Sequence, residues 1–167
     1  MARRRGSGAW VGLVGLGLLA GCVSTVPTDP ATHATDPDCA SLILATPDEL
    51  GDGLDRRQTT AQATTAWGDP AIVLRCGIEP PGPTTERCET VSTPGGPSVD
   101  WLVVPDSPQA EADPAVAADW TFTTYGRVPA VEVLVPAAQV TQQRSSAFLD
   151  ALGPAIAAHS EQRRTCL

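Results

Sequence analysis

Cys22 is the first residue of the chain whose type and position suggest chemistry. It follows an apolar run from Ala9 to Leu18 and then Leu19-Ala20-Gly21, and three arginines at positions 3–5 precede the run. The run is shorter than the roughly 20 residues that span a bilayer, and this order is typical of a secretory leader. A large residue three positions before a cysteine, with small residues directly before it, is the pattern at which bacterial lipoproteins are processed. We therefore predict a signal peptide over residues 1–21 and a lipid, diacylglycerol with acyl chains such as palmitate, on Cys22; a plain cleaved signal with a free Cys22 is the alternative.

The other four cysteines, Cys39, Cys76, Cys88 and Cys166, fit two disulfides, since export places the chain in an oxidising compartment. Four cysteines allow three pairings. Cys76 and Cys88 flank "GIEPPGPTTER", and a hairpin centred on Gly82 would place them opposite each other on neighbouring strands. The expected pairs are therefore Cys76 with Cys88 and Cys39 with Cys166. Zinc is the rival interpretation, but no CxxC motif or neighbouring histidine supports it, and we predict no metal site.

Arginine and aromatic residues provide the best candidates for a binding site. Trp67 precedes Gly68-Asp69-Pro70, Arg75 lies within a predicted strand, and Tyr125 and Arg127 lie between two others. Guanidinium groups bind carboxylates or phosphates through paired donors, and aromatic rings add a flat contact surface. These four residues are the candidate site for a small anion. The alternative is structural, with Glu132 pairing with Arg75 or Arg127 to hold the sheet.

Evidence for catalysis is weak. The two histidines are His33, in a Pro- and Thr-rich segment, and His159, on the apolar stripe of a predicted C-terminal helix. The sequence contains no GxSxG motif, no phosphate-binding glycine loop and no His/acid metal cluster. Paired carboxylates remain an alternative, but no spacing selects two of them. We name no catalytic residue and no cofactor, leave the question of an enzyme open, and favour a protein without enzymatic activity.

The charge of the chain argues against nucleic acid as a partner. Arginine supplies all 11 basic residues, against 19 acidic residues, for a net charge of −8. Removal of the leader would take away three arginines and no acid, which lowers the net charge to −11. So acidic a surface repels phosphate backbones.

The elements that must position these residues follow from the apolar pattern. Residues 22–38 predict a lipidated cysteine and an extended tether, and residues 39–167 a single globular domain. A short helix is expected over 39–44, with Asp36 or Asp38 near its start. A C-terminal helix carries Phe148, Leu152 and Ile156 on one stripe and is expected to kink or divide at Gly153-Pro154. Residues 105–119 predict an acidic loop.

Alternating apolar residues predict the strands of the domain. They are expected at residues 71–78, 87–92, 99–104, 120–125 and 130–135, with turn residues at 93–98. The expected fold is α+β, with a largely antiparallel sheet of about four or five strands and a short N-terminal helix and a kinked C-terminal helix on one face.

Three segments in this order carry a family resemblance: "LDRRQTTAQATTAWGDPAIVLRCGI" at 54–78, "VDWLVV" at 99–104 and "FTTYGRVPAVEVLVP" at 122–136. Together with the Leu-Ala-Gly-Cys boundary they resemble the domain of unknown function 3515 family, exported lipoproteins of high-GC Gram-positive bacteria. The resemblance covers roughly residues 39–156. It implies the cell envelope as the location, and it brings no activity, substrate or catalytic residue.

These observations converge on a protein held at the outer face of the cytoplasmic membrane by its N-terminal lipid. We expect a non-enzymatic scaffold or accessory factor whose partner is an envelope protein or a cell-wall component. The alternatives are a module that binds a small anionic ligand and an envelope enzyme that acts through carboxylates.

Overall fold

The computed structural model describes residues 24–51, 53–113, 115–140 and 147–167. Its helices are α1 (Pro37–Ala45), α2 (Pro108–Ala112) and α3 (Ala147–His159), with a 3₁₀ turn η1 (Ala137–Gln139). Its strands are β1 (Arg56–Arg57), β2 (Thr64–Trp67), β3 (Ile72–Ile78), β4 (Cys88–Ser92), β5 (Ser98–Pro105), β6 (Trp120–Thr124), β7 (Arg127–Val128), β8 (Ala130–Val135) and β9 (Glu161–Gln162).

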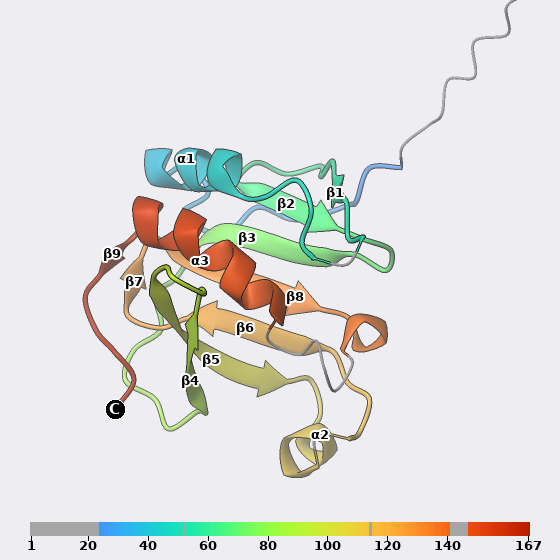
Figure 1. Ribbon diagram of the computed structural model, residues 1–167, viewed down its shortest axis with the longest axis vertical. Helices are drawn as coiled ribbons and strands as arrows, with labels where there is room; N and C mark the ends of the chain where they lie inside the picture. Colours follow the sequence, from blue (N-terminus) through green and yellow to red (C-terminus); the bar gives the residue numbers. More distant parts are fainter. Residues whose placement is uncertain (1–23, 52, 114, 141–146) are drawn as a thin grey trace, which may run out of the picture.

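One antiparallel sheet forms the body of the described structure. Its seven strands lie in the order β1-β2-β3-β8-β6-β5-β4, and β7 pairs with β9 in a small second sheet. Helices α1 and α3 pack against each other over one face of the large sheet (Figure 1). The α+β class and the antiparallel sheet are thus confirmed.

The sheet has more strands than the four or five expected. All five predicted strands are present as β3, β4, β5, β6 and β8, and β1 and β2 extend the sheet beyond β3. All four residues of β2, Thr64–Trp67, are buried, so this strand lacks the alternation of apolar and polar residues that marks a half-exposed strand. That is why the pattern missed it.

Helix α1 begins at a capping residue, and helix α3 continues past a proline. Asp36 caps α1 by accepting a hydrogen bond from the backbone N–H of Asp38 (2.9 Å), and Pro37 occupies the first turn, where it costs no hydrogen bond. Of the two outcomes expected at Gly153-Pro154, a kink or a division, the division is excluded, because α3 runs as one helix through Pro154. The predicted acidic loop at 105–119 also contains a helix, α2, capped by the Ser107 hydroxyl.

The hydrophobic core lies between the sheet and the two helices. Phe122 of β6 meets Phe148 of α3 edge to face, with ring centroids 6.2 Å apart. Leu152 and Ile156 of α3 are fully buried, as the predicted stripe requires. Other large side chains that are fully buried in this core are Leu42, Ile72, Leu74, Trp101, Val131 and Val133.

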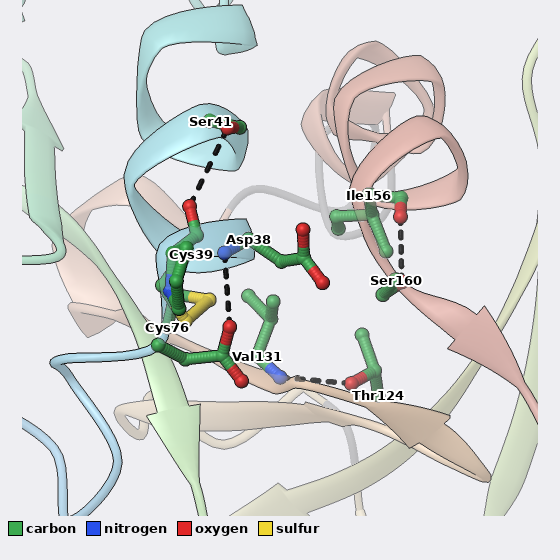
Figure 2. The surroundings of a disulfide bond; sticks show 10 residues. Asp38, Cys39, Ser41, Cys76, Thr124, Val131, Ile156 and Ser160 are labelled. Atoms are coloured by element: carbon green, nitrogen blue, oxygen red, sulfur yellow. Dashed lines mark hydrogen bonds between the residues drawn. A yellow bond between two sulfur atoms is a disulfide. The ribbon is translucent and has the colours of Figure 1, made fainter.

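The disulfide pairing differs from the expected one. In the described residues Cys39 of α1 is bonded to Cys76 of β3, and Cys88 of β4 is bonded to Cys166 near the C-terminus. The first disulfide ties α1 to the sheet, beside Val131 of β8 (Figure 2).

Strand order explains why the predicted hairpin pairing is wrong. Strands β3 and β4 are not neighbours, because β8, β6 and β5 lie between them. Four strand spacings separate them by about 19 Å, far more than the roughly 7 Å that a disulfide spans between Cα atoms. The register also places Cys88 on the face that carries Arg75, whereas Cys76 points to the helix-covered face.

The tether predicted over residues 22–38 is a further correction. From Ser24 on, this segment packs against the domain: Val26 is buried and forms a parallel bridge with Thr59. Farther along, the backbone N–H of His33 donates to the Gly77 carbonyl (2.7 Å). A Cβ on Gly77 would lie 2.4 Å from the His33 carbonyl oxygen, so only glycine accommodates this approach.

The C-terminal tail docks in the same manner. The backbone N–H groups of Arg163 and Arg164 donate to the Gly126 carbonyl at 2.6 and 3.2 Å. Gly126 has a φ of +67°, and a Cβ there would lie 2.3 Å from the Arg164 carbonyl oxygen. Each end of the described chain is thus held by a glycine contact and by a nearby disulfide.

Candidate functional site

Arg75, the first candidate ligand residue, is paired within the protein. It lies directly opposite Glu132 across β3 and β8. Its Nε and Nη2 atoms donate to Oε1 of Glu132 at 2.9 and 2.5 Å, and the two side chains are 28% and 16% exposed. A charge-assisted contact of this kind holds both side chains against the sheet. The structural alternative therefore describes Arg75.

Arg127, the second candidate, is buried at the junction of β7, β5 and the end of α3. Its guanidinium donates to the carbonyl oxygens of Ser98 and Ser160 (both 3.2 Å) and to Oε1 of Gln162 (2.8 Å). Ser160 directly follows α3, so the cation sits at the negative end of that helix. Desolvation by burial lowers the pKa of Arg127 from its ordinary value, and the charge of Asp100 acts in the opposite direction.

The two aromatic candidates lie in different places, Trp67 in the core and Tyr125 in the wall of a cavity. Trp67 is fully buried, and its indole N–H donates to the Pro47 carbonyl (2.9 Å), so it belongs to the core. Tyr125 is half-buried and lines a cavity of about 260 Å³ together with Leu102 and the Cys88–Cys166 disulfide. The four residues proposed from the sequence therefore do not form one site.

A second cavity of about 260 Å³ gathers arginines at the end of the sheet near β7. Its lining consists of residues 80–82, residues 126–128, Arg163 and Arg164. Arg163 is half-exposed and pairs with Glu161 at 3.0 Å. Arg127 lines the same cavity, and its buried Nε has no hydrogen-bond partner among the described residues. The cavity is thus lined by positively charged side chains and lies where the C-terminal tail packs against Gly126.

The C-terminal tail is further held by Asp100, a buried acid in β5. One carboxylate oxygen accepts from the Thr90 hydroxyl (2.6 Å), and the other accepts from the backbone N–H of Cys166 (2.9 Å). Sequence reasoning missed both this residue and the tail arginines. The signal available was Gly126 between Tyr125 and Arg127, which marks a close backbone approach without naming the segment that approaches.

Cys22, the predicted lipidation site, lies outside the described residues, which begin at Ser24. Arg57 donates to the carbonyl oxygen (3.0 Å) and the hydroxyl (2.7 Å) of Ser24. The same guanidinium donates to the Gly68 carbonyl (2.9 Å) and lies 3.7 Å from a carboxylate oxygen of Asp69. Ser24 is therefore fixed at the corner of the sheet formed by β1 and the β2–β3 turn.

Two further properties concern only the part of the chain that the structure describes. No group of three or more His, Cys, Asp or Glu side chains is arranged there to hold a metal ion. Among the helices of these segments, none has the length and apolar character needed to cross a bilayer.

Comparison with known proteins identifies the family. No curated protein and no solved structure matches the chain significantly. A family model described as "Protein of unknown function (DUF3515)" matches residues 21–165. This range includes the docked N-terminal segment and every disulfide cysteine except Cys166. The chain therefore belongs to the DUF3515 family.

Proposed function

We propose that this chain is an exported protein anchored by a lipid on Cys22 to the outer face of the cytoplasmic membrane. The observation that carries the proposal is the cysteine pairing. Cys39, Cys76, Cys88 and Cys166 are joined in two disulfides, which leaves Cys22 as the one cysteine outside these bonds. Two disulfides suit an oxidising compartment, and the Leu-Ala-Gly sequence before Cys22 suits lipoprotein processing.

Replacement of Cys22 tests the anchor. The wild-type protein is expected in the membrane fraction, with acyl chains on its N-terminal peptide by mass spectrometry. Cys22→Ala is expected to lose the acyl chains and to remain unprocessed, as is the wild-type protein when lipoprotein signal peptidase is inhibited. Thr25→Ala, at an exposed position close by, is the matched control and should behave as wild type. Wild-type protein without acyl chains in the soluble fraction would refute the anchor.

For the domain we propose a non-enzymatic role, as a scaffold or accessory factor that contacts an envelope protein or a cell-wall component. Support comes from the way its singled-out polar residues are used. Arg75 is paired with Glu132, and Arg127 is bonded to main-chain carbonyls, so both contribute to the fold. Crosslinking in intact cells from exposed Leu44 of α1, followed by identification of the linked species, tests this role. Reproducible capture of one envelope component is expected; lack of any crosslink from several exposed positions would contradict it.

Binding of a small anion is the second candidate function of the domain, because one observation favours it. The cavity near β7 collects Arg127, Arg163 and Arg164 in a protein of net charge −8. Titration with inorganic phosphate and with a dicarboxylate, followed by calorimetry, tests this candidate. Joint replacement of Arg163 and Arg164 by Ala should abolish binding, whereas Arg87→Ala, at a half-exposed arginine paired with Glu89, should not. Equal binding by all three proteins would contradict an anion site here.

A further inference from the structure

The N-terminal segment is fixed to the domain almost from the predicted lipidation site. Ser24 accepts two hydrogen bonds from Arg57, at 3.0 and 2.7 Å. Two residues later, the backbone N–H of Val26 donates to the Gln58 carbonyl (2.8 Å), and the Val26 carbonyl accepts from Thr60 (3.1 Å). Val26 is also buried, with 9% of its surface exposed. This part of the chain is therefore a strand-like element of the domain.

Very little chain separates that element from Cys22. One residue, Val23, lies between Cys22 and Ser24. A fully extended backbone covers at most about 3.6 Å per residue, so the Cα atoms of Cys22 and Ser24 are no more than about 7 Å apart. A lipid on Cys22 places its glycerol at the membrane surface. The connection is thus too short to hold the domain away from the headgroups.

From this connection we propose that the domain sits on the lipid headgroups with one defined corner, formed by β1 and the β2–β3 turn at residues 68–71. The proposal rests on lipidation of Cys22. Its partner is the phospholipid headgroup layer of the same membrane. Asp69 in the turn is 90% exposed, whereas the neighbouring Arg57 is 19% exposed, so the short connection to the lipid, and not attraction between charges, holds this corner at the headgroups.

The opposite end of the sheet then faces away from the membrane. Strand β3 runs from Ile72, next to the turn, to Ile78, which pairs with Ala130 at the start of β8. Seven strand residues span about 23 Å. Strands β7 and β9 and the C-terminus lie at that far end, whereas the described chain enters beside β1 (Figure 1). The arginine-lined cavity is therefore presented to the envelope beyond the membrane.

Distance-dependent quenching in vesicles tests the orientation. The full lipidated protein is reconstituted in phosphatidylcholine/phosphatidylglycerol vesicles that contain a lipid with a nitroxide on its headgroup. A fluorescent amino acid replaces either Asp69 at the corner or Glu161 in β9, which are matched acidic residues with 90% and 69% exposed side chains. We expect quenching at Asp69 to exceed quenching at Glu161 several-fold.

A longer connection tests the cause of that difference. Insertion of about 20 Gly and Ser residues between Cys22 and Val23 provides a coil that spans roughly 25 Å, and it should remove most of the quenching at Asp69. The same insertion between Gly95 and Gly96, at the exposed β4–β5 turn, should leave it unchanged. A difference between the two probes that survives the N-terminal insertion would overturn the role of the short connection.

The outcomes separate this inference from the proposed anchor. Acylated protein that shows equal quenching at both probes, or stronger quenching at Glu161, overturns the orientation and leaves the anchor standing. Protein whose Cys22 carries no acyl chain by mass spectrometry, and which does not sediment with the vesicles, overturns both.

Discussion

Arg75 and Glu132 lie directly opposite each other on adjacent antiparallel strands, on the sheet face turned away from α1 and α3. Thr64 flanks Arg75 on β2, and Thr123 flanks Glu132 on β6, so the ion pair lies in the middle of a row of polar residues. Such cross-strand pairs stabilise a sheet without belonging to its hydrophobic core.

The pair predicts a specific pattern of coupled mutations. Arg75→Ala and Glu132→Ala should each lower the free energy of unfolding, and the double mutant should cost less than their sum by about 1 kcal/mol, because removing both leaves no unpaired half-buried charge. Chemical denaturation of the four variants measures this coupling. The exposed pair Arg163 and Glu161 is the control, with coupling near zero. Additive effects at Arg75 and Glu132 would contradict the structural role.

The disulfides predict an unambiguous peptide map. Digestion without reduction should recover Cys39 linked to Cys76 and Cys88 linked to Cys166. The loop-entropy model assigns them up to about 4 and about 4.5 kcal/mol of stability, since the linked residues are 37 and 78 positions apart. The double replacement of Cys88 and Cys166 by Ala should therefore lower stability at least as much as that of Cys39 and Cys76. A peptide that links Cys76 to Cys88 would contradict the observed strand order.

Gly126→Ala should release the C-terminal tail. Its φ of +67° strains any other residue, and the added Cβ would collide with the Arg164 backbone. Gly95→Ala is a matched control, because Gly95 has a φ of +68° and no atom within 4 Å of the added Cβ. We expect Gly95→Ala to cost about 1 kcal/mol and Gly126→Ala clearly more. Hydrogen exchange at the Arg163 and Arg164 amides should accelerate in Gly126→Ala alone; equal exchange in both variants would argue against the docked tail.

Arg127→Ala should destabilise the protein by about 1–3 kcal/mol, because it removes a buried side chain together with its hydrogen bonds to Ser98, Ser160 and Gln162. Thermal unfolding measures the loss. Arg164→Ala, at an exposed side chain next to the same cavity, should leave the melting temperature unchanged. An Arg127→Ala protein that melts like the wild type would return this residue to the list of ligand-binding candidates.

Thr28→Ala should loosen the N-terminal segment. The Thr28 hydroxyl bonds to the Thr64 hydroxyl (3.1 Å) and accepts from the Ala61 backbone N–H (3.2 Å), so its loss should cost about 1 kcal/mol. Thr25→Ala, where the side chain is exposed, is the control. Proteolysis near residue 26 should become faster in Thr28→Ala only. Unchanged cleavage and stability would contradict docking of this segment.

Local pattern was sufficient to find the elements that have one apolar and one polar face. The alternation of Ile72, Leu74 and Cys76 predicted β3, and the stripe of Phe148, Leu152 and Ile156 predicted α3, because burial on one side repeats with the period of the backbone. The α+β class follows from the same patterns, whereas the family resemblance is carried by the segments at 54–78, 99–104 and 122–136. Strand β2 lacks such a period, since it is buried on both faces, and was missed.

Contacts between distant segments required the tertiary structure. Which cysteines meet depends on strand order, and β3 and β4, neighbours along the chain, lie on opposite sides of three intervening strands. Docking of residues 24–36 depends on backbone hydrogen bonds to Gln58, Thr60 and Gly77, which side-chain composition does not encode. A Pro- and Thr-rich segment therefore predicts a tether when considered alone. It becomes part of the domain only because the fold presents unpaired backbone groups and a glycine without a Cβ along its path.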